Sequence, residues 1–210
     1  MFYKKHKYYL AYSLFVSKGD EQLLKLDTKK LALASILGAL AAASEVIKGP
    51  PFDIPFPLMP NAISWDLTGL PMMVSLLFAG PIAAVYTSVI GCSIIFLRGN
   101  VAGGTLKLIA ELATILAFAA MRKGFIPKTV AAVASRVLVM SAANYFLLPI
   151  FYGWASHEYV LGILVPLGIF NATQALLNII PAQIIYSKLG DWRRLRLQGI
   201  NPLDSASIKT

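Results

Sequence analysis

Long apolar stretches alternate with short polar segments along most of this chain. A membrane-crossing helix needs about 20 apolar residues, and several of these stretches have that length. One of them, at 69–97, is too long for a single crossing, and Gly80-Pro81 in its middle can end one helix and begin the next. The pattern predicts six helices, at 30–48, 67–79, 81–97, 104–121, 130–151 and 160–187.

Composition supports lipid as the surrounding solvent. Of the 210 residues, 57% are hydrophobic and 14% are charged, whereas soluble domains carry about 25% charged residues. We therefore expect an all-α protein of the cell membrane, a multi-pass bundle of six transmembrane helices. We expect a basic, interfacial N-terminal segment at 1–28, the six-span membrane domain at 29–190 and a cytoplasmic tail at 191–210.

The distribution of positive charge orients the predicted bundle. If both termini lie on one side, that side holds fifteen Lys and Arg residues, and the opposite loops hold only Lys48 and Arg98. Because Lys and Arg accumulate in cytoplasmic loops, both termini are expected in the cytoplasm. The net charge of +9 then follows from topology, with anionic lipid as its counterpart, and no nucleic-acid partner is needed.

The first predicted outer loop, 49–66, is unusual. It contains five prolines together with Phe52, Phe56 and Trp65. Proline restricts the backbone and aromatic side chains favour packing. The loop is therefore expected to pack on the bundle, either as a lid over a cavity that opens outward or as a static interfacial plug.

Polar residues inside the predicted spans are candidates for function, because they are costly in hydrocarbon. Glu111 follows Lys107 by four positions, so it is expected either to form an intrahelical ion pair or to contact a ligand. Asn171, Gln174 and Asn178 share one helical face. Such an amide stripe suits a neutral heterocycle with carbonyls and ring nitrogens. The alternative is hydrogen bonding between helices.

The first predicted span carries two rows of small residues at a spacing of four. Such rows let another helix approach closely, either within the chain or from a partner. The rows are Ala34, Gly38, Ala42 and Ser35, Ala39, Ala43.

Several catalytic signatures are absent from the sequence. It contains no phosphate-binding Gly-x-x-x-x-Gly-Lys-Ser/Thr loop, no Gly-x-Ser-x-Gly and no His-Glu-x-x-His. Cys92 is the sole cysteine, and no histidine falls within a predicted span. The sequence therefore predicts neither an enzyme nor a metal site, and no cofactor of its own.

Four short motifs appear in a distinctive order. They are Ser-Trp-Asp-Leu-Thr-Gly-Leu-Pro at 64–71, Phe-Ala-Gly-Pro-Ile-Ala-Ala at 78–84, Gly-Gly at 103–104 followed by Glu-Leu-Ala at 111–113, and Asn-Tyr-Phe-Leu-Leu-Pro at 144–149 followed by Tyr152. Together, over about residues 28–190, they resemble the S components of energy-coupling-factor (ECF) vitamin transporters, in particular the riboflavin-type branch.

Two positions depart from that branch. Gln174 stands near the position where the branch commonly has a lysine, and Thr114 stands where an asparagine is expected. Both changes alter hydrogen bonding toward a ligand. The resemblance implies riboflavin or a related flavin as substrate, and another vitamin or precursor, such as pantothenate, thiamine or a cobalamin-related compound, is the alternative.

The resemblance also implies partners and a mechanism. An S component captures its vitamin outside the cell and works with a transmembrane coupling subunit and two ATPases, which use the ATP. The resemblance further implies that the coupling subunit contacts Ala34, Gly38 and Ala42. The competing hypotheses are an intramembrane enzyme that uses Glu111 and a purely structural subunit. The expected substrate-binding residues are Trp65, Asp66, Glu111, Thr114, Asn144, Tyr145, Asn171 and Gln174.

Overall fold

The structure is a computed structural model that describes residues 27–47, 49, 53–122 and 124–197. Most of the predicted segment at 1–28, and of the tail at 191–210, lies outside the described residues. Six helices occupy the described part of the chain, as predicted, and their ends differ from the predicted ones by ten residues or fewer. They are α3 (Thr28–Val46), α4 (Gly69–Ala79), α5 (Pro81–Leu97), α6 (Val101–Ala120), α7 (Phe125–Phe151) and α8 (His157–Leu197).

The predicted break between α4 and α5 is confirmed at Gly80-Pro81. Gly80 adopts φ +95°, a conformation that side chains rarely tolerate, and its N–H still donates to the Leu76 carbonyl at 3.1 Å. Pro81 occupies the first helical position of α5, where its missing N–H costs no hydrogen bond. The chain can therefore reverse direction with a single residue between two helices.

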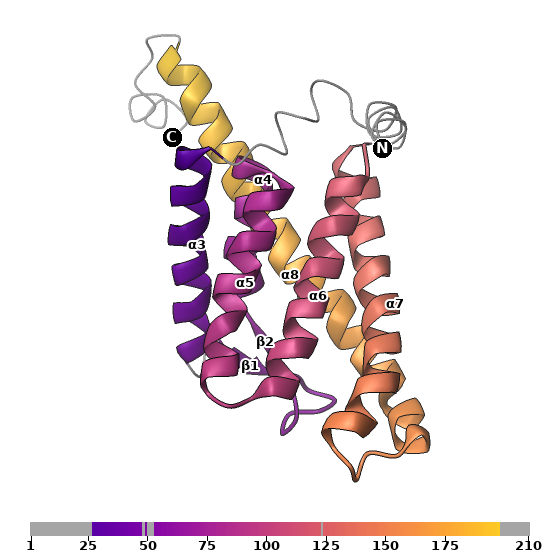
Figure 1. Cartoon of the computed structure of the whole chain (residues 1–210). Coiled ribbons are helices and arrows are strands. Elements are labelled where there is room, and N and C mark those ends of the chain that lie inside the picture. Colours follow the sequence, from indigo (N-terminus) through magenta and orange to yellow (C-terminus); the bar gives the residue numbers. More distant parts are fainter. Residues whose placement is uncertain (1–26, 48, 50–52, 123, 198–210) are drawn as a thin grey trace, which may run out of the picture.

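The helices form one bundle with two distinct ends. In Figure 1, α3 begins and α8 ends at the upper end, where the α4–α5 and α6–α7 connections also lie. The α5–α6 and α7–α8 connections and the two short strands lie at the lower end. Met72 and Met73 of α4, Ile115 of α6 and Ile179 of α8 are fully buried or nearly so. The short α4 therefore forms much of the core.

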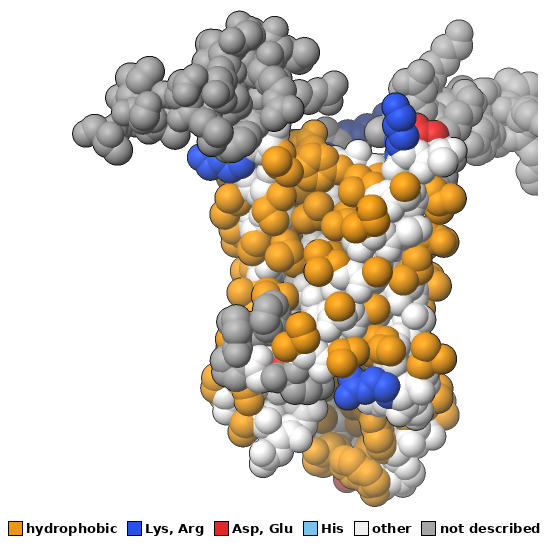
Figure 2. Space-filling view, turned by 90° about the vertical axis from the view of Figure 1, so that its left-hand side faces the viewer, with side chains coloured by type: hydrophobic (Ala, Val, Ile, Leu, Met, Phe, Trp, Pro, Cys, Tyr) orange, Lys and Arg blue, Asp and Glu red, His pale blue; other side chains and the backbone are white. Residues whose placement is uncertain are grey.

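The surface of the bundle suits a membrane. Three helical segments, Val101–Ala120, Phe125–Phe151 and His157–Gly190, are long and apolar enough to cross one, and α4 and α5 are shorter apolar helices. Large aliphatic side chains such as Ile36, Leu138 and Val165 are at least two-thirds exposed. Figure 2 shows hydrophobic side chains over most of the middle of one face. This surface is the one that lipid would cover.

Two three-residue strands accompany the six helices, and the predicted all-α fold class is confirmed. β1 (Asp53–Pro55) pairs antiparallel with β2 (Ser64–Asp66), so that Ile54 lies opposite Trp65. Between them Phe56, which is 2% exposed, packs edge-on against Trp65 and against Phe170 of α8. Residues 53–66 are called loop 1 below. The prediction that this loop packs on the bundle is confirmed for its described residues.

Candidate functional site

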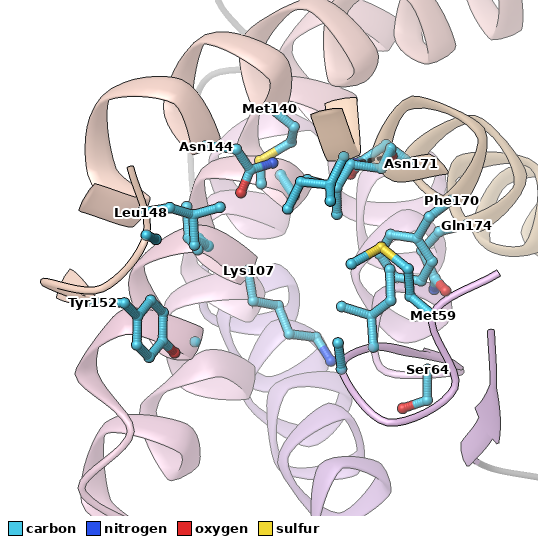
Figure 3. Close-up of a pocket in the computed structure, with 18 of the residues that line it drawn as sticks. Met59, Ser64, Lys107, Met140, Asn144, Leu148, Tyr152, Phe170, Asn171 and Gln174 are labelled. Carbon is cyan, nitrogen blue, oxygen red and sulfur yellow. Dashed lines mark hydrogen bonds between the residues drawn. The ribbon is translucent and has the colours of Figure 1, made fainter. Parts of the chain in front are cut away.

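A cavity of about 420 Å³ lies at the end of the bundle that carries loop 1. Cavities that hold small molecules commonly measure about 300 to 1,000 Å³. Loop 1, α6, α7 and α8 all contribute to its walls (Figure 3). Its apolar lining includes Met59, Met140, Leu148, Leu167 and Phe170. These side chains suit a flat apolar or aromatic ligand, and orientation would depend on the few polar groups among them.

Asn144 is one of those polar groups. It lines the cavity from α7 and is 4% exposed. Within the described part of the chain, its side-chain amide has no hydrogen-bond partner. Its polar atoms are not fully buried, so water or a ligand in the cavity can hydrogen-bond to them. Asn144 is therefore available to a molecule in the cavity.

Arg136 of α7 lines the cavity with a side chain that is almost completely buried. Its Nη1 donates to Glu111 Oε1 at 2.9 Å and to Thr114 Oγ1 at 3.2 Å, and its Nε donates to Asn171 Oδ1 at 3.3 Å. Arg136 and Glu111 are almost completely buried. This pair joins α6 to α7, and it corrects the predicted Lys107–Glu111 pair. Glu111 instead takes its cation from the neighbouring helix.

Lys107 turns toward loop 1. Its Nζ lies 2.6 Å from Glu45 Oε2 of α3 and 2.7 Å from Asp66 Oδ2 of β2, and Figure 3 shows the side chain crossing toward the loop. Burial raises the pKa of Asp66, but the Lys107 ammonium and the Thr68 hydrogen bonds hold its net pKa below the ordinary 3.8. Asp66 is therefore an anion paired with Lys107 at neutral pH.

The predicted amide stripe lies on one buried face of α8, and its members have different neighbours. Asn171 and Gln174 line the cavity. Asn171 Nδ2 donates to the Leu167 carbonyl at 2.8 Å. Asn178 lies deeper, and its Nδ2 approaches both Glu111 carboxylate oxygens at 3.3 and 3.4 Å. The stripe thus combines cavity-lining amides with hydrogen bonds between helices, the two alternatives that the sequence left open.

The structure brings half of the predicted substrate-binding residues together. Asp66, Asn144, Asn171 and Gln174 line the cavity. The other four lie outside its lining. Trp65 Nε1 donates to Thr173 Oγ1 at 2.9 Å, and the Tyr145 ring lies 4.7 Å from the His157 ring. Glu111 and Thr114 are fully buried beside Arg136. Substrate contact by any of the eight stays a prediction.

Sequence reasoning missed several lining residues. Arg136 was the clearest of them, since a lone cation inside a predicted span is itself a signal of function. The aromatic residues of the α7–α8 connection had no such signal, because aromatics are common at membrane interfaces. The missed side chains include Met59, Lys107, Arg136, Met140, Tyr152, Trp154, Tyr159 and Phe170.

The small-residue row on α3 packs partly inside the chain. Ala34 is fully buried, and its carbonyl accepts a hydrogen bond from Thr87 Oγ1 at 3.1 Å. A Cβ added to Gly38 would meet Ile90 of α5 at 2.8 Å. Of the predicted partner-contact row, only Ala42 is left partly exposed. These contacts favour internal packing for Ala34 and Gly38, and partner contact at this row stays a prediction.

Comparison with known proteins gives two similarities and one negative result. No protein-family model matches the chain. The riboflavin transporter FmnP of Bacillus subtilis (strain 168) is 24% identical over 185 residues, which cover 80% of this chain and 95% of that protein.

A solved structure described as the S component of a bacterial ECF transporter superposes with a TM-score of 0.66 and 23% identity. The superposition covers 78% of this chain and 96% of the solved one. The predicted resemblance is confirmed: this multi-pass membrane protein has the fold of the S components of ECF transporters.

Proposed function

We propose that this chain is the substrate-capture subunit of an ATP-driven vitamin uptake transporter, and that its substrate is riboflavin or a related flavin. The observation that carries the proposal is the unpartnered amide of Asn144 in a partly open cavity of about 420 Å³. An amide both donates and accepts hydrogen bonds, as the carbonyls and ring nitrogens of a flavin require. The similarity to a named riboflavin transporter supports the choice of vitamin.

The charges beside the cavity disfavour an anionic substrate. Lys107 is paired with Glu45 and Asp66, and Arg136 is paired with Glu111. Both lining cations are therefore already matched by carboxylates. Lys107 faces two carboxylates, so these five groups carry one negative charge in excess. The anionic pantothenate would meet that excess charge in a poorly solvated site, which costs free energy. A neutral flavin meets no such repulsion.

The orientation follows from charge. The upper end of Figure 1 carries Lys29, Lys30, Arg122 and Lys128, which we infer to be cytoplasmic. The cavity and loop 1 then lie at the outer end of the bundle, where a vitamin is captured. The resemblance to S components implies a transmembrane coupling subunit and two ATPases as partners. We assign ATP hydrolysis to these partners, in keeping with the lack of a phosphate-binding loop in this sequence.

The alternative of an intramembrane enzyme has little support. Its candidate group, the Glu111 carboxylate, is fully buried, bonded to Arg136 and Asn178, and outside the cavity lining. A general acid or base must reach its substrate within hydrogen-bond distance. A purely structural subunit would leave the cavity and Asn144 without a purpose.

A binding experiment tests the proposal. The protein is purified in detergent, its visible absorption is recorded, and any retained small molecule is identified by mass. Titration with riboflavin, pantothenate and thiamine then compares a neutral, an anionic and a cationic vitamin. We expect a yellow sample or tight riboflavin binding without ATP. Riboflavin binding no better than millimolar would refute the flavin assignment. Failure of all three vitamins, in a sample that retains no small molecule, would refute vitamin capture as well.

A further inference from the structure

We propose that Gln174 and Lys107 are positioning residues that hold loop 1 closed over the cavity by gripping Asp66. The biological role of these contacts rests on the proposed function, since a loop held over the cavity would retain the substrate. The grip itself is a property of the folded chain and needs no ligand.

Gln174 grips the backbone of Asp66 at two points. Its Nε2 donates to the Asp66 carbonyl at 2.7 Å, and its Oε1 accepts from the Asp66 N–H at 3.2 Å. A side-chain amide presents a donor and an acceptor side by side, so it can pair with a strand residue as a neighbouring strand would. Gln174 thus satisfies both backbone groups of Asp66 from α8.

The hydrogen bonds of Gln174 leave no donor for a ligand. Its Nε2 also donates to Asn178 Oδ1 at 3.2 Å, and a carboxamide has only two N–H donors. The side chain is 1% exposed. Although Gln174 is a member of the cavity wall, its amide is committed to loop 1 and to Asn178. Its part in substrate binding is therefore to hold the loop.

Lys107 grips the side chain of the same residue. Its Nζ lies 2.7 Å from Asp66 Oδ2, while Asp66 Oδ1 accepts from the Thr68 N–H at 2.9 Å. The same ammonium lies 2.6 Å from Glu45. Asp66 is therefore held by α6 through its carboxylate and by α8 through its backbone. The Lys107 ammonium also connects Asp66 to Glu45 of α3.

Asp66 directly follows the part of loop 1 that lines the cavity. Met59, Ala62, Ile63 and Ser64 line the cavity and come just before Asp66 in the chain. Gln174 and Thr173 lie next to each other on α8, and Thr173 accepts the separate hydrogen bond from Trp65. One residue can therefore be changed while the adjacent contact to loop 1 is kept.

Hydrogen exchange at the Asp66 amide tests the grip on the intact protein without ligand. In Gln174→Leu the amide loses its acceptor, and we expect its exchange to accelerate roughly tenfold. Thr173→Val is the matched control, because it removes the Trp65 contact and leaves both bonds from Gln174 to Asp66. Unchanged exchange in a folded Gln174→Leu protein would overturn the proposal.

Two further variants keep the test decisive if Gln174→Leu does not fold. Gln174→Glu retains an acceptor for the Asp66 N–H but loses the donor to its carbonyl, and Lys107→Met removes the ion pair. Both should accelerate riboflavin release roughly tenfold while Thr173→Val changes release much less. Faster amide exchange with unchanged release would overturn the closing role. If the wild type binds no riboflavin, the proposed function fails, while the exchange measurement still decides the grip.

Discussion

Glu111 and Arg136 form an ion pair at 2.9 Å in the interior of the bundle, although they lie 25 positions apart on α6 and α7. Neither side chain is more than 4% exposed. Two charges buried this far are tolerated only when they neutralise each other and their remaining groups are hydrogen-bonded. Thr114 and Asn171 provide those bonds to Arg136, and Asn178 provides one to Glu111.

Removing one charge of this pair should destabilise the protein strongly. Glu111→Leu leaves the Arg136 guanidinium buried without its anion, and we expect a loss of about 3 kcal/mol in the free energy of unfolding. The double variant Glu111→Leu/Arg136→Leu should recover part of that loss. Thermal unfolding of both single variants and the double variant in detergent measures the coupling. Purely additive losses would show that the two residues do not act as a pair.

Asn144 and Asn171 should respond differently to truncation. Asn144→Ala removes an amide that the described fold does not use, so we expect unchanged thermal stability and roughly tenfold weaker riboflavin binding. Asn171→Ala removes the acceptor of the Arg136 Nε–H, so both stability and binding should fall. Riboflavin titration and thermal unfolding measure the two effects. Unchanged affinity in Asn144→Ala would contradict its assignment to the substrate.

Gly69 should tolerate no side chain. It begins α4 beneath Asn178 and Glu111, and an added Cβ would meet the Glu111 carboxylate at 2.6 Å and overlap the Asn178 amide. We expect Gly69→Ala to destabilise the protein by about 2 kcal/mol, as overpacking does. Gly162→Ala on α8 is the control, since nothing lies within 4 Å of an added Cβ there. Equal thermal midpoints for both variants would disprove the close approach.

The Asp66–Lys107 ion pair should make the thermal stability of the protein depend on pH in the acidic range. The pKa of Asp66 lies below 3.8 in the folded protein, so its contribution is fully present above that ordinary value. The contribution is lost as pH falls through the lower folded-state pKa. We therefore expect the difference in thermal midpoint between wild type and Asp66→Asn to shrink on acidification below about pH 4. A difference that stays constant across that range would contradict the pairing.

Local and compositional patterns determined much of this protein. The apolar runs gave six helices, Gly80-Pro81 gave the α4–α5 break, and the spacing of Asn171, Gln174 and Asn178 gave one buried amide face. Each of these depends on neighbours within a few turns, or on the contrast between apolar and charged stretches. Helical periodicity and hydrophobic burial act at that range, so the sequence alone was sufficient.

The tertiary structure alone decided which charges meet. Lys107 and Glu111 are four positions apart, yet Lys107 pairs with Glu45 and Asp66, and Glu111 pairs with Arg136. Lysine before glutamate is the less favourable order for an intrahelical pair. A buried charge is stable only beside a group of opposite charge, so tertiary contacts decide its partner. The rotation of each helix and the fold of loop 1 place those partners, and they also leave Asn144 free. Sequence spacing carries no information about either.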